Sequence, residues 1–478
     1  GIKVGKFIPI TEMPLPPKPV DIAENKESRH AYRRKAALVN NVNSQAFRRS
    51  CRTRMTMEAV RRFKDRERFF LPWSYDYRGR VYPIPAFLTP QDTDFGKSLL
   101  NFADASFVFP EDEKWLSFQV ATTYGLDKAT IKDRLEWTTN NHHLITRIAE
   151  DPIGCLPDWE GAEDDKWLFL AACDEYYHCC IKRDRDYTAL PVAVDATCSG
   201  LQVLAGLCRD ASTASLVNVL PGERPADAYA TVAEHAKQHI DEKWREHVDR
   251  GVAKRLVMTI PYNAKFKSNW GYVNSALNDP EDQGGKALNV PKDDVTTITH
   301  ALRDAAFDTF PGPMRVMKWI ESEVGKALKR GLTELVWTTP SGFVVTQKIM
   351  KADWVKVNLQ LLGQVKQTRV AIGDSDEVNT SKHKAATAPN LIHSLDASLL
   401  HLTALRFDAP IALIHDSVLC RATDMGLLSC LVRETYMHLF AEHDYLNDFA
   451  QQIGAETEPP IIGDLEPSSV IDSTYFFC

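Results

Sequence analysis

The chain contains 478 residues, of which 44% are hydrophobic and 25% charged, values close to those of globular proteins. This composition excludes a collagen-like, a low-complexity and a disulfide-rich protein, and the length suggests roughly two to four domain-sized units. The formal net charge of −7 does not by itself indicate a nucleic-acid-binding protein.

Neither a membrane span nor a disulfide framework is indicated. The sequence has no apolar run of about 18 residues, and its start resembles neither a secretory leader nor an Arg-rich transit peptide. Its ten cysteines are scattered without a C-x-x-C pair, which argues against a zinc ribbon and favours reduced thiols in a cytosol. The Pro-rich start predicts a linker, and Gly1 in place of Met leads us to expect a processed product or a fragment.

The first long predicted element is a basic helix. The pattern over Lys26 to Arg68 is helical, and the segment from Arg29 onward is rich in arginine. Such a stripe can follow nucleic-acid phosphates even in an acidic protein, although a solvated helix face explains it equally well. The stretch FFLPWSYDYRGRVYPIPAFL then predicts turns and short strands, with a change of domain near residue 70.

Helical stretches over 110–185 lead to a strand that ends in an aspartate. PVAVDATCSG combines small and β-branched residues, which predicts a buried strand with Asp195 at its carboxyl end. Small residues from Ala196 to Gly200 would let the backbone and carboxylate approach a charged ligand closely. Alone the pattern is weak, because an aspartate at a strand end is more often a turn residue or helix cap.

Residues 225–330 show helical patterns, within which Arg250 and Lys254 fall on one helix face. If that helix continues, Tyr262 lies about 18 Å along its axis and within about 120° of the same side. Two cations and an aromatic ring could grip a triphosphate and contact a sugar or base. Without the other elements, an amphipathic surface helix is the better interpretation.

The sequence then predicts a β-rich stretch over 331–372, a polar loop over 373–386, and further helix and strand. Near the end, His415, Asp416 and Ser417 interrupt the apolar run IALIHDSVLC. Three polar groups in a buried hairpin are costly unless they are paired or bind a ligand, so a functional site is the better interpretation. Two aspartates at separate strand edges suit a two-metal phosphoryl-transfer site with ions about 4 Å apart.

Five segments together resemble the ordered motifs of single-subunit RNA polymerases of bacteriophages, mitochondria and plastids. They are DYRGRVYP (76–83), VDATCSGLQ (194–202), RGVAKRLVMTIPYN (250–263), APNLIHSLDASLL (388–400) and IHDS (414–417). The resemblance implies a mainly helical α+β, right-hand polymerase fold with palm, fingers and partial thumb, and RNA synthesis on a DNA template.

The resemblance also implies roles for single residues. Asp195 and Asp416 would hold two Mg²⁺ ions, with the carbonyl of Ala196 as a further ligand. Tyr262 and His393 would read the ribose 2′-hydroxyl, which is both a donor and an acceptor. Other cations and one tyrosine would contact the triphosphate, the metal surroundings or the template backbone: Lys254, Arg250, Lys128, Tyr229, Arg78 and Arg80.

The family also places a β-hairpin in the promoter major groove, and VKVNLQLLGQVKQTRV resembles it. Its polar residues alternate as side chains on one face of a ribbon would, and they could read base edges. These residues are Lys356, Asn358, Lys366 and Thr368. An ordinary surface hairpin stays open as the alternative.

The implied domains follow one another along the chain. They are a linker and partial thumb (1–66), a first part of the palm (67–109), a palm insertion (110–184), the catalytic palm strand (185–211), the fingers with a hairpin over 355–372 (212–392), and the second part of the palm with the C-terminal segment (393–478).

Two departures from the family pattern are present. Asn263 replaces a glycine after Tyr262, and Pro261 precedes it, so we expect the helix to kink or end there. The upstream recognition domain is absent, so we expect promoter-dependent initiation to need a further N-terminal domain or chain.

The expected partners are a DNA template and promoter, nascent RNA and ribonucleoside triphosphates, without a membrane, in the cytoplasm of an infected bacterial host rather than an organelle. Three alternatives stay open: a family A-like DNA polymerase, a nucleic-acid-binding protein that has lost catalysis, and a catalytic fragment that needs a separate N-terminal part. DYRGR and PNLIHS favour RNA synthesis, and both aspartates together with Lys254 argue against lost catalysis. The C-terminal STYFFC resembles an aromatic segment that packs near the family's active site.

Overall fold

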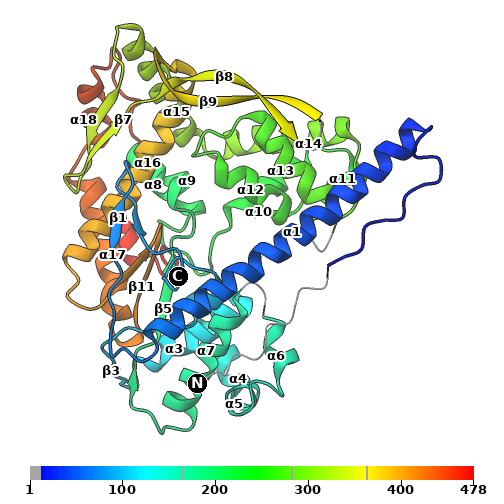
Figure 1. Ribbon diagram of the computed structural model, residues 1–478. Helices are drawn as coiled ribbons and strands as arrows, with labels where there is room; N and C mark the ends of the chain where they lie inside the picture. The colour runs from blue at the N-terminus through cyan, green and yellow to red at the C-terminus, as the bar shows by residue number, and fades with distance from the viewer. Residues whose placement is uncertain (1–11, 163–164, 281–283, 362–363) are drawn as a thin grey trace.

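The computed structural model describes residues 12–162, 165–280, 284–361 and 364–478 (Figure 1). The helices of the first half are α1 (Lys26–Phe63), α2 (Asp94–Lys97), α3 (Glu113–Ala121), α4 (Ile131–Asn140), α5 (His142–Glu150), α6 (Leu156–Glu160), α7 (Lys166–Tyr176), α8 (Ser199–Cys208) and α9 (Ala211–Leu216). Those of the second half are α10 (Ala228–Lys237), α11 (Glu242–Arg245), α12 (Arg250–Thr259), α13 (Phe266–Asn278), α14 (Lys292–Thr309), α15 (Pro311–Lys329), α16 (Thr380–Leu405), α17 (Met425–Ala441) and α18 (Tyr445–Ile453). The mainly helical α+β class predicted from the sequence is therefore confirmed.

The strands form small antiparallel sheets among these helices. They are β1 (Trp73–Tyr75), β2 (Val81–Pro83), β3 (Ser106–Phe107), β4 (Tyr187–Thr188), β5 (Pro191–Asp195), β6 (Leu335–Thr338), β7 (Val344–Gln347), β8 (Met350–Leu361), β9 (Gln364–Val378), β10 (Ala412–Ile414) and β11 (Ser417–Arg421). Short π-helical or 3-10 turns cover Thr122–Leu126, Tyr177–Ile181, Ala422–Asp424 and Pro467–Asp472.

A three-stranded sheet of order β10-β11-β5 brings together two segments that lie far apart in the sequence. Val194 of β5 pairs with Val418 of β11, and both side chains are buried on the core side of the sheet. The alternation of buried and accessible residues along β5 follows from the two-residue period of a strand. The buried strand predicted before Asp195 is thus confirmed, and it lies beside the predicted hairpin.

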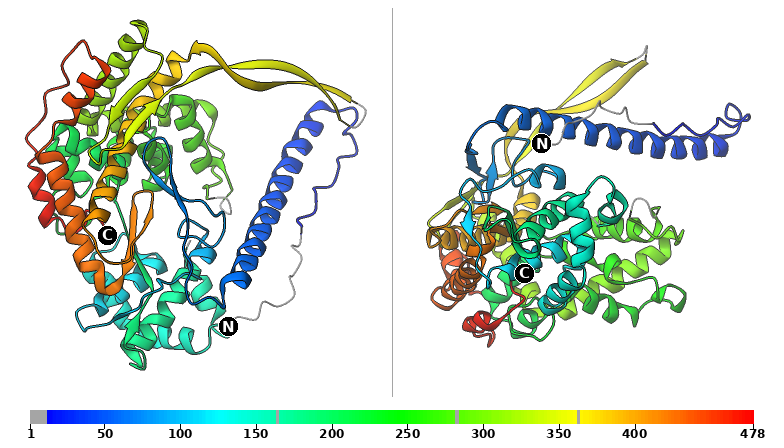
Figure 2. Two further views of the ribbon diagram at one scale, coloured as in Figure 1. Left: turned by 60° about the vertical axis from the view of Figure 1, so that its left-hand side comes forward. Right: turned by 90° about the horizontal axis from the view of Figure 1, so that it is seen from below.

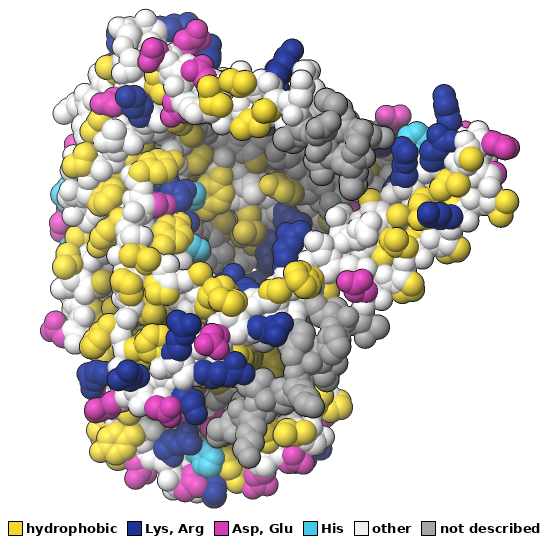
Figure 3. Space-filling model, viewed as in Figure 1, with side chains coloured by type: hydrophobic (Ala, Val, Ile, Leu, Met, Phe, Trp, Pro, Cys, Tyr) yellow, Lys and Arg dark blue, Asp and Glu magenta, His cyan; other side chains and the backbone are white. Residues whose placement is uncertain are grey.

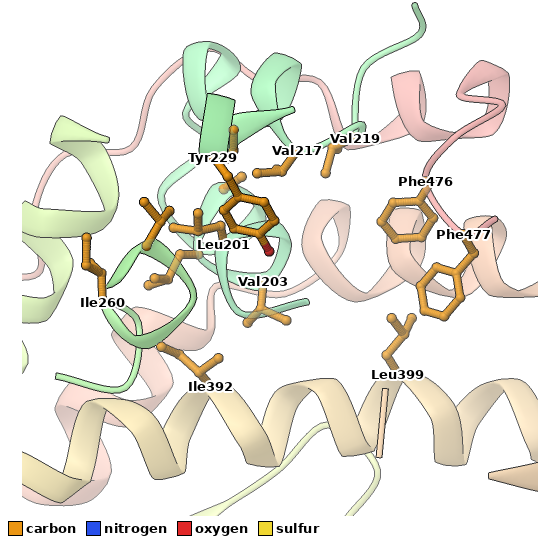
Figure 4. Close-up of a cluster of buried hydrophobic side chains, with 14 of the residues drawn as sticks. Leu201, Val203, Val217, Val219, Tyr229, Ile260, Ile392, Leu399, Phe476 and Phe477 are labelled. Atoms are coloured by element: carbon orange, nitrogen blue, oxygen red, sulfur yellow. The ribbon is translucent and has the colours of Figure 1, made fainter. Parts of the chain in front are cut away.

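The core of the protein lies behind this sheet, around α8. Every residue of α8 is buried, as expected for a helix that is apolar on nearly all sides. Leu201 and Val203 of α8 lie above α16, which contributes Ile392 and Leu399 (Figure 4). In the same view Phe476 and Phe477, near the end of the chain, lie on this same side of α16, with Phe477 above Leu399. These contacts fix the positions of the elements that carry the site.

Helix α1 stands apart from the rest of the molecule as a long arm (Figure 2). It begins at the cap Asn25, whose side chain accepts hydrogen bonds from two main-chain N–H groups, and it ends at Phe63 rather than at Arg68. Thr56 is its only buried residue, and the Thr56 hydroxyl donates to Asp92 over 3.2 Å. Arg52 donates to the same buried carboxylate over 2.9 Å. One aspartate therefore holds the base of a helix whose remaining length is largely solvated.

The other projecting element is the β8–β9 ribbon, which arches toward the far end of α1 (Figure 2). It replaces the polar loop predicted over 373–386: β9 continues to Val378, which pairs with Met350, and α16 begins at Thr380. That prediction was wrong because a two-stranded ribbon exposed on both faces needs no apolar alternation. Asn379 caps α16 by accepting a hydrogen bond from the Lys382 N–H.

Each cysteine is a free thiol, in agreement with the prediction from their spacing. In the part of the chain that the structure describes, none of the helices has the length and apolarity needed to cross a bilayer.

Candidate active site

Two predicted metal ligands, Asp195 and Asp416, meet at adjacent strand ends. Asp195 is the last residue of β5 and pairs in register with Ser417, so Asp416 follows immediately across the ladder. The Ala196 N–H donates to the Asp416 carbonyl over 3.3 Å. His415 and Asp416 form a two-residue turn, in which His415 has a left-handed φ of 57°. Such strain costs on the order of 1–3 kcal/mol and is typical of functional turns.

The protein around Asp195 disfavours the negatively charged form of its carboxyl group. Burial by the surrounding protein raises the pKa of the Asp195 carboxyl, even though its own side chain keeps contact with solvent, and the Asp416 charge raises it further. A hydrogen bond from Ser417 and the charges of Lys97 and Lys128 act in the opposite direction. The surrounding protein thus disfavours the charged form of the Asp195 carboxyl, and a bound cation would stabilise that form.

A broad hollow opens on the face shown in Figure 3, between the body of the molecule and α1. Lys and Arg side chains gather inside it, although the whole chain is acidic. A cationic concave surface concentrates anionic ligands such as phosphates. The net charge of the chain therefore gives no indication of this local cationic surface, and the sequence predicted a basic surface only for α1.

The C-terminal segment supports the strand end that carries Asp195. The Cys478 N–H donates to the Asp195 carbonyl over 3.1 Å, and Phe477 forms an isolated β-bridge with Ala196. Gln202 of α8 donates through its amide to the Phe476 carbonyl over 3.0 Å. A small cavity lined in part by Ala196, Asp416 and both phenylalanines lies beside this segment. The expected packing of STYFFC near the site is therefore present.

The aromatic pair predicted to read the sugar lies together. The rings of Tyr262 and His393 are 4.6 Å apart between centroids, with an interplanar angle of 38°. Burial raises the Tyr262 pKa to about 12 and lowers the His393 pKa to about 2, so both side chains are neutral. Helix α12 ends at Thr259, before Pro261, which confirms the expected helix end, so the 18 Å estimate, which assumed a helix continuing to Tyr262, does not apply.

A glycine makes room for that tyrosine. A Cβ added to Gly200, in the first turn of α8, would lie 3.0 Å from the Pro261 Cβ and 3.4 Å from the Tyr262 hydroxyl oxygen. The segment after α12 therefore packs directly on the small residues that follow Asp195. The approach of a charged ligand to Ala196–Gly200 stays a prediction, and the neighbour that the structure shows at Gly200 is Tyr262.

The turn between β1 and β2 brings two predicted arginines to the site, and both are paired within the protein. Arg78 forms an ion pair with Asp76 at 2.6 Å, and its Nη1 lies 2.6 Å from His393 Nδ1. Arg80 forms an ion pair with the buried Asp396 of α16. Burial raises the Asp396 pKa to about 7, and the neighbouring Arg80 guanidinium opposes that rise. The two guanidinium groups thus tie the turn to α16.

The cations predicted to bind the triphosphate differ in their exposure to solvent and in their ion pairing within the protein. Arg250 donates to Asp227 over 2.5 Å and lies 5.4 Å from the Tyr229 ring centroid. Lys254, one turn later on α12, is exposed, and no ion pair to it is found within the described ranges. Lys128 is also exposed, and among the described residues it forms an ion pair with its neighbour Asp127 at 2.5 Å. Lys254 and Lys128 are therefore the accessible cations of this set.

Tyr229 lies beneath the site rather than on its surface. Its side chain is buried beside Cys198, which follows Asp195 closely in the chain, and burial raises its pKa above the ordinary value. Figure 4 shows its ring above Val203 in the core. Its predicted contact with the substrate or the metal surroundings stays a prediction, and the structure places its ring against the turn that follows β5.

The four predicted ribbon residues do not share one face. In antiparallel strands directly paired residues lie on the same face, and Lys356 pairs with Arg369 while Asn358 pairs with Gln367. Thr368 pairs with Val357, so it lies on the opposite face. The side chain of Lys366 lies outside the described residues. The prediction that these residues form one reading face was wrong, because their relative register across the turn is set by the hairpin.

Sequence reasoning missed three residues of this region. Asp396 lies within the segment APNLIHSLDASLL, and its position in the apolar run SLDASLL was the available signal. Lys97 acts on the Asp195 charge from the short helix α2, and nothing in its local sequence distinguishes it. Arg369 shares the face of Lys356, which only the strand register reveals.

The chain is similar in sequence to known proteins. A family model described as DNA-dependent RNA polymerase matches residues 110–463. DNA-directed RNA polymerase of Enterobacteria phage K11 is 28% identical, with 99% of this chain and 59% of the relative covered. DNA-directed RNA polymerase 2, chloroplastic/mitochondrial, of Arabidopsis thaliana is 30% identical, and the match covers 99% of this chain and 49% of the relative. T7 RNA polymerase of Escherichia phage T7 is 27% identical, and the match covers 99% of this chain and 61% of the relative.

The chain thus spans about half the length of the curated relatives it matches. The family model covers most of the chain, and the relatives align with nearly all of it. This chain belongs to the DNA-dependent RNA polymerase family.

Proposed function

We propose that this chain catalyses RNA synthesis on a DNA template, adding ribonucleotides to an RNA 3′ end. The observation that carries the proposal is the meeting of Asp195 and Asp416 at adjacent strand ends. The stacked Tyr262 and His393 rings supply a neutral, hydrogen-bonding surface for a ribose. The family membership and the names of the relatives support the same activity.

The donor set fits magnesium. The described residues contain no cluster of three or more His, Cys, Asp or Glu side chains, which argues against a zinc-type cage in the described ranges. Two carboxylates, with water and substrate phosphates completing the shell, are how Mg²⁺ is usually held. Burial and, to a smaller extent, the Asp416 charge raise the pKa of Asp195, and a divalent cation would offset both effects. Asp195, Asp416 and the Ala196 carbonyl would hold the ions.

Bound magnesium would supply activation of the 3′-hydroxyl and stabilisation of the departing pyrophosphate. The residues of this chain would do the rest by positioning. Lys254 and Lys128, both exposed, would bind the triphosphate, with Arg250 oriented by its Asp227 partner. Tyr262 and His393 would orient the sugar, and Gly200 would allow the tyrosine to lie against α8. His415 would hold the turn that presents Asp416.

We also propose that the elements follow the right-hand layout of palm, fingers and thumb. The β10-β11-β5 sheet would form the palm floor, α10 to α15 the fingers, and α1 part of a thumb. The β8–β9 ribbon would contact promoter DNA through one face, on which Lys356, Asn358 and Arg369 lie together. Thr368, which lies on the other face, would not take part in this contact. No role is proposed for Lys366. The phage relatives favour a host-cell cytoplasm as the compartment, whereas the plant relative is named chloroplastic/mitochondrial.

The test is extension of an RNA primer on a DNA template with magnesium, supplying ribonucleotides and deoxynucleotides separately. Asp195→Asn and Asp416→Asn should each lower the extension rate by at least about a thousandfold, because each removes one metal-binding charge. Asp408→Asn, at an exposed aspartate before β10, is the matched control and should extend normally.

The outcomes separate the competing functions. Ribonucleotide extension that both active-site variants lose supports the proposal. Preferred use of deoxynucleotides would favour a DNA polymerase. Absence of extension with either substrate, alongside intact binding of the primer–template, would favour a catalytic part that requires a separate N-terminal portion, and adding such a portion from a relative would test that alternative.

A further inference from the structure

Arg78 is placed to control a single atom of His393. Its Nη1 lies 2.6 Å from His393 Nδ1, a hydrogen-bond distance. A guanidinium only donates hydrogen bonds and stays protonated at any ordinary pH. The Nδ1 atom must therefore be the acceptor, so it carries no proton, and the ring proton of a neutral His393 lies on Nε2.

Asp76 holds the arginine in this orientation. Its Oδ2 accepts from Arg78 Nε over 3.0 Å and from Nη2 over 2.6 Å, while Oδ1 accepts from the Arg78 and Arg80 main-chain N–H groups over 2.9 and 3.1 Å. The fork of the guanidinium thus uses one edge for the carboxylate and leaves Nη1 for the histidine. A lysine could not make both sets of contacts.

The other side of the imidazole is free. Within the described ranges no protein group makes a hydrogen bond to His393 Nε2, and the ring lies against Tyr262 at 4.6 Å. Burial, with the nearby charges of Arg80 and Arg78, also lowers the His393 pKa to about 2, which keeps the ring neutral. The free edge is therefore a fixed N–H donor.

We propose that Arg78, oriented by Asp76, is a positioning residue for sugar selection, which locks His393 as the Nε2–H tautomer so that this N–H donates to the 2′-oxygen of the incoming ribonucleotide. This inference rests on the proposed function. It assigns Arg78 a role toward the nucleotide sugar, through His393, in place of the template contact that the resemblance implied. An imidazole with Nδ1–H would offer a lone pair at that edge instead, and the hydroxyl would have to act as donor.

The tautomer can be measured without catalysis. In protein labelled with ¹⁵N-histidine, the His393 signal, identified by its loss in His393→Asn, should show a protonated Nε2 and an unprotonated Nδ1. The Arg78→Met variant should show a mixture of tautomers or a protonated ring. A wild-type His393 with its proton on Nδ1 would overturn the proposal, whether or not the chain polymerises RNA.

The functional consequence is tested by the ratio of kcat/KM for ribonucleotides to that for deoxynucleotides. Arg78→Met should lower this ratio about tenfold, the value of one hydrogen bond, and Arg78→Lys should lower it less. Arg183→Met, at an exposed arginine paired with Glu113 on the outer surface, is the control and should keep the ratio. Thermal unfolding of each variant excludes a folding defect as the cause.

A double-mutant cycle decides whether Arg78 acts through the histidine. In a His393→Ala background, Arg78→Met should change the ratio by less than about twofold, because the group that it positions is gone. An unchanged ratio in the single variant, or an equal fall in both backgrounds, would overturn the proposal. If the wild-type chain showed no polymerisation at all, the proposed function would fail while the ¹⁵N measurement still tested the tautomer.

Discussion

The Cys478 N–H donates to the Asp195 carbonyl over 3.1 Å, so the end of the chain is bound to the strand end that carries a proposed metal ligand. Phe476 is fully buried against Tyr436 of α17, with ring centroids 4.9 Å apart. Phe477 pairs with Ala196 on the other side of the same turn. The C-terminal segment thus belongs structurally to the carboxylate site.

Deleting Phe476 to Cys478 should therefore lower both stability and activity. Loss of a buried phenylalanine alone costs about 3–5 kcal/mol, and the turn after β5 loses its main-chain partner. Chemical denaturation and primer extension would measure the two effects. Cys478→Ala, which keeps the main-chain bond, should remain close to wild type in both assays. Full activity of the deletion variant would show that the segment does not support the site.

Gly200→Ala should impair nucleotide use without unfolding the protein. The added Cβ would lie 3.0 Å from the Pro261 Cβ and 3.4 Å from the Tyr262 hydroxyl, so the tyrosine must shift. We expect KM for ribonucleotides to rise several-fold and selectivity against deoxynucleotides to fall, as measured by steady-state extension. Gly271→Ala is the matched control, since nothing lies within 4 Å of its added Cβ. Equal kinetics for the two variants would contradict the packing argument.

Glu323 should make part of the stability pH-dependent. Its buried carboxylate accepts from Lys326 over 2.6 Å, from Thr457 over 2.7 Å and from the Glu456 N–H over 2.7 Å. Although burial alone would raise it, these bonds lower the Glu323 pKa to about 2. A lowered carboxyl pKa stabilises the fold above the unfolded value of about 4.3, and the contribution is lost as pH falls toward 2.

Comparison of the wild type with Glu323→Gln measures that contribution. The difference in unfolding free energy should be constant above about pH 5, at no more than about 3 kcal/mol, and should shrink as pH falls to about 2. Urea denaturation at a series of pH values gives this difference directly. A difference that does not change between these pH values would mean that the carboxylate is not stabilised in the fold.

Asp92→Asn should loosen α1 selectively. Asp92 accepts hydrogen bonds from Arg52, Thr56 and the Leu88 main-chain N–H, and the substitution places an amide N–H₂ group among these donors. We expect this to lower the local stability by about 1–3 kcal/mol. Hydrogen exchange should accelerate throughout α1 and remain slow in the buried helix α8. Thr53→Ala, one turn earlier on the exposed side, should leave exchange in α1 nearly unchanged. Equal acceleration in α1 and α8 would indicate global destabilisation instead.

The sequence predicted best where one local rule applied. Apolar strands interrupted by Asp195 and Asp416 identified the two strand ends, because burying a carboxylate in such a run is costly without a function. Pro261 identified the end of α12, because proline cannot continue a helix. These features depend on a few neighbouring residues, which a single sequence displays.

Features that depend on distant residues could not be predicted in the same way. The faces of the β8–β9 ribbon follow from the register of two strands, and shifting that register by one residue changes the face of each side chain. The pairing of Arg80 with Asp396 joins residues 316 positions apart. The length of β9 depended on its pairing with β8 rather than on its own polar composition. Tertiary contacts decided these points, and local sequence did not contain them.

The attachment of α1 at Asp92 makes the helix a lever arm. At about 1.5 Å per residue, the end at Lys26 lies about 45 Å from Thr56, so a rotation of about 10° at the base would carry it about 8 Å. Asp92 lies two residues before α2, and Lys97 of α2 acts on the charge of Asp195. The short segment from Asp92 to Lys97 therefore both anchors the arm that extends over the hollow and contributes to the electrostatics of the carboxylate site.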